Sequence, residues 1–303
     1  MCKSKLIFNH YFKFGNSQKL LNTDNVDALL RLFESADEID NVLAGYVSDV
    51  LEDLITNDYI LASTYLLSNL NIIDNLIKHS YDTSVCKKII ASLLFQKDNR
   101  LSACWKDVKE EEIEKRYNPN LKVFLHRLFN KLNNSKNSDI SVNILSIIRD
   151  GIDKDERGKP RIAYIEKLFY SHDTIYSLFR FLSNLDVHKK GKIEFNLCLQ
   201  TLQTLLHLYP MIYYGYTEPV TDENQPESFC IVQSFIDKIE FFKEVLEKQE
   251  ERTCLDTQGN VRTLLSSTRI YIAKLILPAL KLRNQRINLS LSLSHIFETL
   301  SVS

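Results

Sequence analysis

Residues 41–55, Asn41-Val-Leu-Ala-Gly-Tyr-Val-Ser-Asp-Val-Leu-Glu-Asp-Leu-Ile55, carry the pattern that decides the fold of this chain. In this segment apolar side chains recur three and four residues apart, at Leu43, Tyr46, Val47, Val50, Leu51, Leu54 and Ile55. This spacing puts the side chains on one face of an α-helix, because 3.6 residues complete a helical turn. It returns in residues 121–132 and 195–209, so we expect amphipathic helices to be the repeating unit of the chain.

Further helices are expected wherever similar apolar spacing is bounded by polar clusters. We place them at 24–35, 58–70, 71–79, 84–95, 140–150, 161–170, 173–185, 228–248, 262–282 and 288–300. Asp139 and Asp173 each precede an apolar segment and are expected to cap it, since a carboxylate accepts hydrogen bonds from free first-turn amides. Pro278 is expected to kink or end its helix, because proline lacks a backbone N–H.

The composition, 303 residues with Gly 7 and Pro 6, favours the same fold class. Hairpins, nucleotide-binding loops and nucleophile elbows use glycine where the backbone needs a positive φ, and this chain has little glycine for them. No segment of strand length alternates apolar and polar residues convincingly, so a sheet is not expected. The sequence therefore predicts an all-α protein, an armadillo/HEAT-like α-solenoid of stacked helix pairs, although no strict sequence period accompanies it.

Two polar stretches interrupt the helical pattern. Residues 151–161, GIDKDERGKPR, are charged and contain Gly and Pro, and residues 210–227 include the acidic run TEPVTDENQP. Both are interpreted as loops. Because neither is long enough to separate independent domains, we expect residues 1–303 to form a single armadillo-like helical domain.

Charge and cysteine usage limit the partners and the compartment. The net charge is -1, with Lys+Arg 38 against Asp+Glu 39, so no global field attracts nucleic acid or an anionic membrane and any binding must be local. The cysteines form neither a CxxC motif nor a Cys/His cluster at metal-ligand spacing, which fits a reducing compartment. We recognise no secretion signal and no membrane-spanning run, so we expect a protein of the cytoplasm or the nucleus.

One pair of residues suggests metal chemistry. His172 and Asp173 are adjacent, as in metal-dependent phosphohydrolases of helical fold, which recruit further His and Asp ligands from other helices. His126 and His207 would be the additional ligands. The alternative is that the run Ser-His-Asp-Thr is an ordinary helix N-cap, which accounts for Asp173 without a metal, and we favour it.

Residues 186–197 follow the outline of a calcium-binding EF-hand loop but lack its ligands. His188 and Lys190 stand at the third and fifth ligand positions, and Leu197 stands where a bidentate Glu is required. A polar turn between helices is the preferred interpretation. Since phosphate-binding glycine motifs and metalloprotease or hydrolase motifs are also missing from the sequence, we expect no metal, no cofactor and no enzymatic activity.

Several segments resemble, in the same order along the chain, blocks of the SAPS family of phosphatase-associated subunits. Residues 41–50 are similar to the family's run N-x-L-L-A-G/S-Y/F-F-S-K-V, and residues 73–94 to I-D-x-L-I-x-H-I-x-x-S-A-I-x-D-L-L-x-x-L-L. Residues 138–149 resemble S-N-A-S-x-x-L-C-E-I-I-R. Residues 256–277 resemble a later block, but 261–267 lack its paired prolines and second glycine.

This resemblance implies a regulatory or scaffold subunit that binds a type-2A-like serine/threonine phosphatase catalytic subunit and directs its substrate choice. Carried over from the family blocks, the partner-binding residues would be Asn41, Gly45, Tyr46, His79 and Arg269. Three of them also have a structural interpretation: Gly45 allows close helix packing, Tyr46 belongs to the apolar stripe, and Arg269 caps or pairs locally.

Two other functions stay open at this point. The first is an armadillo-like adaptor for another protein, such as a transport or cytoskeletal factor. The second is the helical metal-dependent phosphohydrolase centred on His172 and Asp173.

Overall fold

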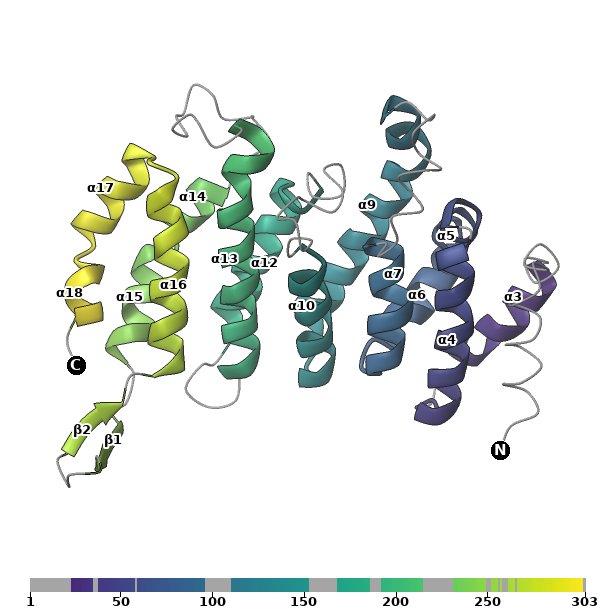
Figure 1. The fold of residues 1–303 in the computed structure, drawn as a ribbon, viewed down its shortest axis with the longest axis horizontal. Helices are drawn as coiled ribbons and strands as arrows, with labels where there is room; N and C mark the ends of the chain where they lie inside the picture. The colour runs from purple at the N-terminus through teal and green to yellow at the C-terminus, as the bar shows by residue number, and fades with distance from the viewer. Residues whose placement is uncertain are drawn as a thin grey trace. The chain divides into compact units, whose positions relative to one another are not determined.

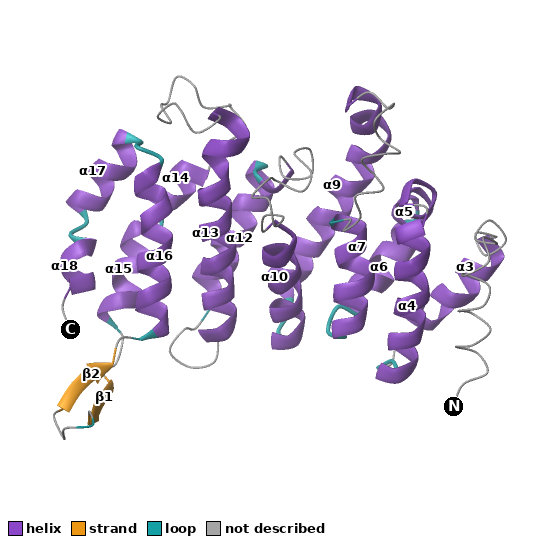
Figure 2. Ribbon diagram, viewed as in Figure 1, coloured by secondary structure: helices purple, strands orange, loops and turns teal. Residues whose placement is uncertain are grey.

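The computed structural model describes residues 23–34, 38–57, 59–95, 110–152, 168–185, 192–214, 231–248, 252–255, 257, 261–264 and 266–301. Nearly all of them are in helices, as Figures 1 and 2 show, and this confirms the prediction of a helical protein. The chain divides into two compact units, residues 1–147 and 148–303. The division falls inside helix α10 (Ser138–Ile152), just before the loop predicted at 151–161.

The described part of the first unit consists of helices. In chain order they are α3 (Thr23–Leu30), the 3₁₀ helix η1 (Arg31–Glu34), α4 (Asn41–Asn57), α5 (Tyr59–Ser68), α6 (Leu70–Lys78), the π-helix η2 (Val85–Ile90), α7 (Ala91–Leu94), α9 (Glu110–Asn134) and the first part of α10. Because η2 runs directly into α7, the segment predicted as one helix at 84–95 is a single helix whose first part has the wider π pitch.

Helix α4 lies beside the η2–α7 helix and runs in the same direction (Figure 1). Two contacts set this direction: Gly45 faces Ser84, and one turn further along both helices Asp49 forms an ion pair with Lys88. Both helices contribute fully buried side chains to the core, among them Ala44, Leu51, Ile55, Val85, Ile89 and Ile90. Burying one large aliphatic side chain contributes about 1.5–3 kcal/mol, so this seam is a main source of stability for the unit.

The second unit continues the helical pattern and adds one hairpin. Its elements after the end of α10 are α12 (His172–Asn184), α13 (Lys192–Tyr214), α14 (Ile231–Ile236), α15 (Ile239–Glu247), β1 (Arg252–Leu255), β2 (Val261–Leu264), α16 (Ser267–Lys281), α17 (Gln285–Leu293) and α18 (Ile296–Ser301). The most extensive packing is between α13 and α16, which lie side by side in Figure 1. Asn196 Nδ2 donates to Ser267 Oγ at 3.2 Å, so the two helices begin next to each other and run parallel.

The hairpin corrects the prediction that the chain contains no sheet. Strands β1 and β2 pair antiparallel, with Arg252 opposite Leu264 and Leu255 opposite Val261, in a segment where a helix was expected from residue 262 (Figure 2). The strands are too short to alternate visibly in the sequence. The signal that was available is the run Asp256-Thr-Gln-Gly-Asn260 between them, because Asp, Gly and Asn are the residues that reverse a chain between strands.

Several helix ends also differ from the prediction. Ser171 caps α12, its Oγ accepting from Thr174 N–H at 3.4 Å, and Asp173 lies inside the first turn. At α10 the side chain of Asn137 accepts from the N–H of Asp139 at 2.8 Å, so the cap again lies ahead of the predicted carboxylate. In both cases an earlier polar residue reaches the free amides first.

Other helix and loop boundaries also lie at different residues from those predicted. The helix predicted at 228–248 is broken into α14 and α15 by a turn at Asp237 and Lys238. Helix α13 continues to Tyr214, so the loop predicted at 210–227 does not begin at 210. Pro278 lies in the last turn of α16, which ends three residues later, as expected for a proline that cannot donate a backbone hydrogen bond. Residues 161–167 of the helix predicted at 161–170 lie outside the described residues.

Among the helices described, none combines the length and the apolarity needed to cross a lipid bilayer.

Candidate protein-interaction surface

The start of α4 presents a group of apolar side chains to solvent. Asp40 caps the helix: its Oδ1 accepts from the N–H groups of Val42 at 3.0 Å and Leu43 at 2.9 Å. The cap fixes the first turn, from which Val42 is 66%, Leu43 47% and Tyr46 37% exposed. An apolar group of this kind at one helix end is a feature of protein-binding sites, because its burial against a partner is favourable.

This exposure corrects part of the predicted apolar stripe. Leu43 and Tyr46 were expected to face the core together with Val47, Leu51 and Leu54, but only the last three are buried. The apolar residues of the segment span more than one helix face, since Val42 also belongs to them. That excess width is the sequence signal that could have identified Val42 and Leu43 as surface residues.

Beyond its first turns, the surface of α4 is acidic. The helix contains Asp49, Glu52 and Asp53 and no Lys or Arg. Asp49 is paired with Lys88 of η2. The pKa of Asp53 is raised from its ordinary value, chiefly because partial burial disfavours the charged carboxylate and secondly because Asp49 lies close to it. The exposed face of α4 therefore changes from apolar to anionic along its length.

Three of the residues named from the family resemblance meet on this surface. Asn41 is the first residue of α4 and is exposed, and Gly45 and Tyr46 follow one turn later. A Cβ added at Gly45 would lie 3.8 Å from Ser84 Oγ, an ordinary van der Waals distance. Packing alone therefore does not require glycine at this position.

His79, the fourth of these residues, is buried and hydrogen-bonded on both sides of its ring. Its Nε2 lies 3.1 Å from the carbonyl oxygen of Phe33, and its Nδ1 lies 3.2 Å from Tyr81 Oη. A carbonyl only accepts, so Nε2 carries the proton and Nδ1 accepts from the Tyr81 hydroxyl. That hydroxyl in turn accepts from Ile39 N–H at 3.1 Å. His79 thus lies beneath the surface, where it ties η1 and the segment preceding α4 to the end of α6.

Arg269, the fifth residue, belongs to the second unit. It is half-buried in the first turn of α16, where its backbone N–H donates to Ser266 Oγ at 3.1 Å. This bond makes Ser266 the N-cap of the helix. The capping role that the sequence suggested for Arg269 is therefore performed by the serine.

The metal hypothesis has no constellation of ligands in the described part of the chain. His172 and Asp173 are both exposed, with Nδ1 and Oδ1 3.6 Å apart, and the His172 ring stacks on Tyr176. His126 and His207 are exposed on α9 and α13. No group of three or more His, Cys, Asp or Glu side chains able to hold a metal ion occurs among the described residues. Residues 186–191 of the EF-hand-like segment lie outside them.

Two cysteines that could have served as nucleophiles are buried in helix packing. The Cys86 thiol donates to Ser80 O at 3.1 Å, and the Cys198 thiol donates to Leu178 O at 3.5 Å. Burial raises the pKa of both thiols far above the ordinary value. Because only the thiolate is an effective nucleophile, neither side chain is suited to covalent catalysis.

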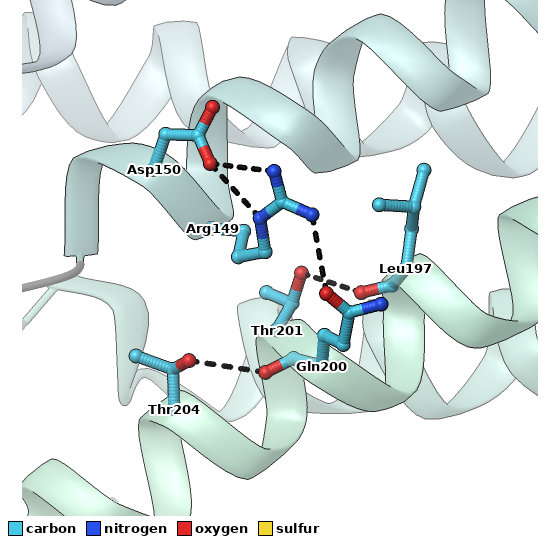
Figure 3. Close-up of polar contacts among 6 residues, drawn as sticks. All are labelled: Arg149, Asp150, Leu197, Gln200, Thr201 and Thr204. Atoms are coloured by element: carbon cyan, nitrogen blue, oxygen red, sulfur yellow. Dashed lines mark hydrogen bonds and ion pairs between the residues drawn. The ribbon is translucent and has the colours of Figure 1, made fainter. Parts of the chain in front are cut away.

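A polar cluster joins the end of α10 to α13 in the second unit (Figure 3). Arg149 donates from Nε and Nη2 to Asp150 Oδ1, at 2.9 and 2.7 Å, and from Nη1 to Gln200 Oε1 at 3.2 Å. On α13 the Thr204 hydroxyl donates to Gln200 O at 3.1 Å. Arg149 ends the segment 138–149 that was singled out from the sequence, but Gln200 had no signal in the sequence, because its partner lies on another helix.

Comparison of the chain with protein-family models, with curated proteins and with solved structures found no match in any of the three.

Proposed function

We propose that this protein is a non-catalytic helical scaffold that binds a type-2A-like serine/threonine phosphatase catalytic subunit and directs its substrate choice. One observation carries the proposal: the exposed apolar side chains at the start of α4 fall within residues 41–50, the segment that resembles the SAPS family. Val42, Leu43 and Tyr46 are the anchors, and Asn41 adds an amide at the edge. The cytoplasm or the nucleus is the compartment that this function requires.

The architecture that we propose for this scaffold is an armadillo/HEAT-like α-solenoid. Parallel helix neighbours support it: α4 runs parallel to the η2–α7 helix in the first unit, and α13 runs parallel to α16 in the second. In a solenoid the equivalent helices of successive repeats lie side by side and run parallel, whereas in an up-and-down four-helix bundle the packed neighbours are antiparallel and the parallel helices lie diagonally across the core. An extended row of such helices provides a large surface on which a few residues can anchor a globular partner.

The energetics of the α4 surface suit a binding site that depends on few residues. Burying a Val, Leu or comparable side chain contributes about 1.5–3 kcal/mol, and interface affinity is usually concentrated in a handful of anchors. Tyr46 adds a ring and a hydroxyl, a combination enriched at interface hot spots. The hydrogen bonds of the buried His79 hold the segment before α4 in place and so help to position this surface.

A binding measurement with purified components tests the proposal. The full chain is immobilised, and the affinity of a purified type-2A-like phosphatase catalytic subunit is measured for the wild type, Val42→Glu and Tyr46→Ala. We expect each variant to weaken binding about tenfold or more, since it removes an anchor or places a charge in an apolar contact.

Ile193→Glu is the matched control. Ile193 is the second residue of α13, as Val42 is the second residue of α4, and both are 66% exposed. The control should bind as the wild type does. A wild-type chain that does not bind the catalytic subunit would refute the proposal, and equal losses in Val42→Glu and Ile193→Glu would refute the assignment to α4.

The non-catalytic part of the proposal has its own test. Metal analysis of the purified full chain should find no stoichiometric divalent metal that is lost on His172→Ala. Finding one would replace the scaffold with the helical metal-dependent phosphohydrolase considered from the sequence.

A further inference from the structure

The charges of the C-terminal part of the chain are segregated, although the whole chain is nearly neutral. Residues 257–297 contain no Asp or Glu. The same stretch contains Arg262, Arg269, Lys274, Lys281, Arg283 and Arg286. A local positive field is therefore built into the second unit, independently of the α4 surface in the first.

Helix α16 arranges part of this charge into a regular stripe. Ile270, Lys274, Leu277 and Lys281 are exposed and follow one another at i, i+4, i+7 and i+11, which places them on one face of the helix. Ile270 is 40% and Leu277 55% exposed. At about 1.5 Å per residue, the two lysines are about 10 Å apart along the axis, with Leu277 between them.

The neighbouring helix adds apolar surface without negative charge. Glu194 is the only acidic residue of α13, and it is buried. Ile193 is exposed at the start of the helix, beside the start of α16. Within the described residues, the α13–α16 pair therefore exposes aliphatic and basic side chains but no carboxylate. Figure 1 shows the two helices side by side.

We propose that this α16 face, with the start of α13 beside it, binds an acidic peptide segment of a partner protein that also carries aliphatic side chains. Lys274 and Lys281 have no carboxylate partner among the described residues, so carboxylates of a partner would supply the missing charge. Ile270, Leu277 and Ile193 would lie against its aliphatic side chains. The inference does not rest on the phosphatase proposal, because the two surfaces use different units.

The chemistry of the face favours a peptide over a nucleic acid. Single-stranded nucleic acids are bound by aromatic side chains on which bases stack, together with a track of several cations. On the α16 face the exposed apolar residues are aliphatic, and the ring of Tyr271 on the same helix is half-buried, with Lys274 Nζ 5.5 Å from its centroid. Two lysines separated by a leucine match a peptide with alternating acidic and aliphatic positions better than a continuous phosphate backbone.

A peptide-binding assay on the full chain tests the inference. The probe is a synthetic peptide in which Glu and Leu repeat at helical spacing, and its affinity is measured for the wild type and for Lys274→Glu/Lys281→Glu. We expect the double variant to lose about tenfold or more in affinity, because two attractions become repulsions. It should also gain affinity for the charge-reversed peptide with Lys in place of each Glu.

Two controls distinguish binding at the α16 face from an effect of the net charge of the chain and from a purely ionic association. Lys122→Glu/Lys136→Glu reverses two exposed lysines of the first unit and should leave the affinity for the acidic peptide within about twofold. Leu277→Ser should weaken binding about threefold or more, which a purely ionic association would not do.

Three results would overturn the inference. They are an unchanged affinity in Lys274→Glu/Lys281→Glu, an equal loss in the control pair, and binding of single-stranded oligouridylate in preference to the acidic peptide.

Discussion

Helices α4 and α16 are of similar length and each buries one apolar face in its own unit, yet their exposed faces are opposites. The charged residues of α4 are Asp49, Glu52 and Asp53, and those of α16 are Arg269, Lys274 and Lys281. Aliphatic side chains are exposed on both. The difference teaches that core packing constrains only the buried residues of such a helix. The exposed residues are free to differ in charge, and they can therefore match the charge of a binding partner. The net charge of the whole chain is near zero, so it does not reveal that α4 is acidic and α16 is basic.

The two helices also differ in how their first turns are held. The segment before α4 is tied down by a long-range chain of hydrogen bonds through the buried His79, from Phe33 to Ile39. The start of α16 has a local cap, Ser266, and one side-chain bond from Asn196 to Ser267. The start of α4 is therefore held through a buried side chain of a distant segment, whereas α16 is held by a local cap and by its packing against α13.

The largest effect is expected from His79→Ala. The change removes a buried ring and leaves the carbonyl oxygen of Phe33 without its donor, so the free energy of unfolding should fall by about 2–4 kcal/mol. Hydrogen exchange, measured segment by segment in denaturant, should show the loss of protection around α4. Ser266→Ala is the counterpart at α16 and should lower stability by about 1 kcal/mol, with the loss confined to the second unit. Equal effects of the two substitutions would remove this contrast between the helices.

An intermediate effect is expected when the variants are exchanged between the two binding assays. Val42→Glu should leave the affinity for the acidic peptide within about twofold, and Lys274→Glu/Lys281→Glu should leave the affinity for the phosphatase catalytic subunit within the same limit. Each should weaken binding about tenfold in its own assay. If one variant weakens both interactions equally, the two helices do not act as separate surfaces.

The smallest effect is expected from Gly45→Ala. Alanine is favoured over glycine in a helix, and the added Cβ would make only an ordinary contact with Ser84, so the free energy of unfolding should rise by about 0.5–1 kcal/mol. Ala273→Gly, at an exposed position of α16, should lower it by a similar amount. Denaturant titration of both variants measures this. Destabilisation by Gly45→Ala would mean that α4 packs closer to the η2 helix than expected from the 3.8 Å between a Cβ at position 45 and Ser84 Oγ.

Some of the proposed functional residues could be identified from a short stretch of sequence, whereas the role of others depends on contacts with residues that are distant along the chain. Asn41, Gly45 and Tyr46 were named from one short segment, and they are neighbours on α4 for the same reason, since Asn41 and Gly45 are four residues apart and Tyr46 follows Gly45 directly. His79 was named from the same resemblance but is buried, because Phe33 and Tyr81 surround it. Gln200 was not named at all, because its contact with Arg149 joins two helices.

The sequence by itself determined that this is a helical protein and where most of its helices lie, because an apolar period of 3.6 is a local property that each segment carries alone. Tertiary structure decided which apolar residues are buried, so that Val47 faces the core while Val42 and Leu43 face solvent. It also decided where helices stop, as at Asp237, and where a hairpin replaces a helix, as at Val261. Burial and pairing depend on segments that are distant along the chain, and no local pattern contains that information.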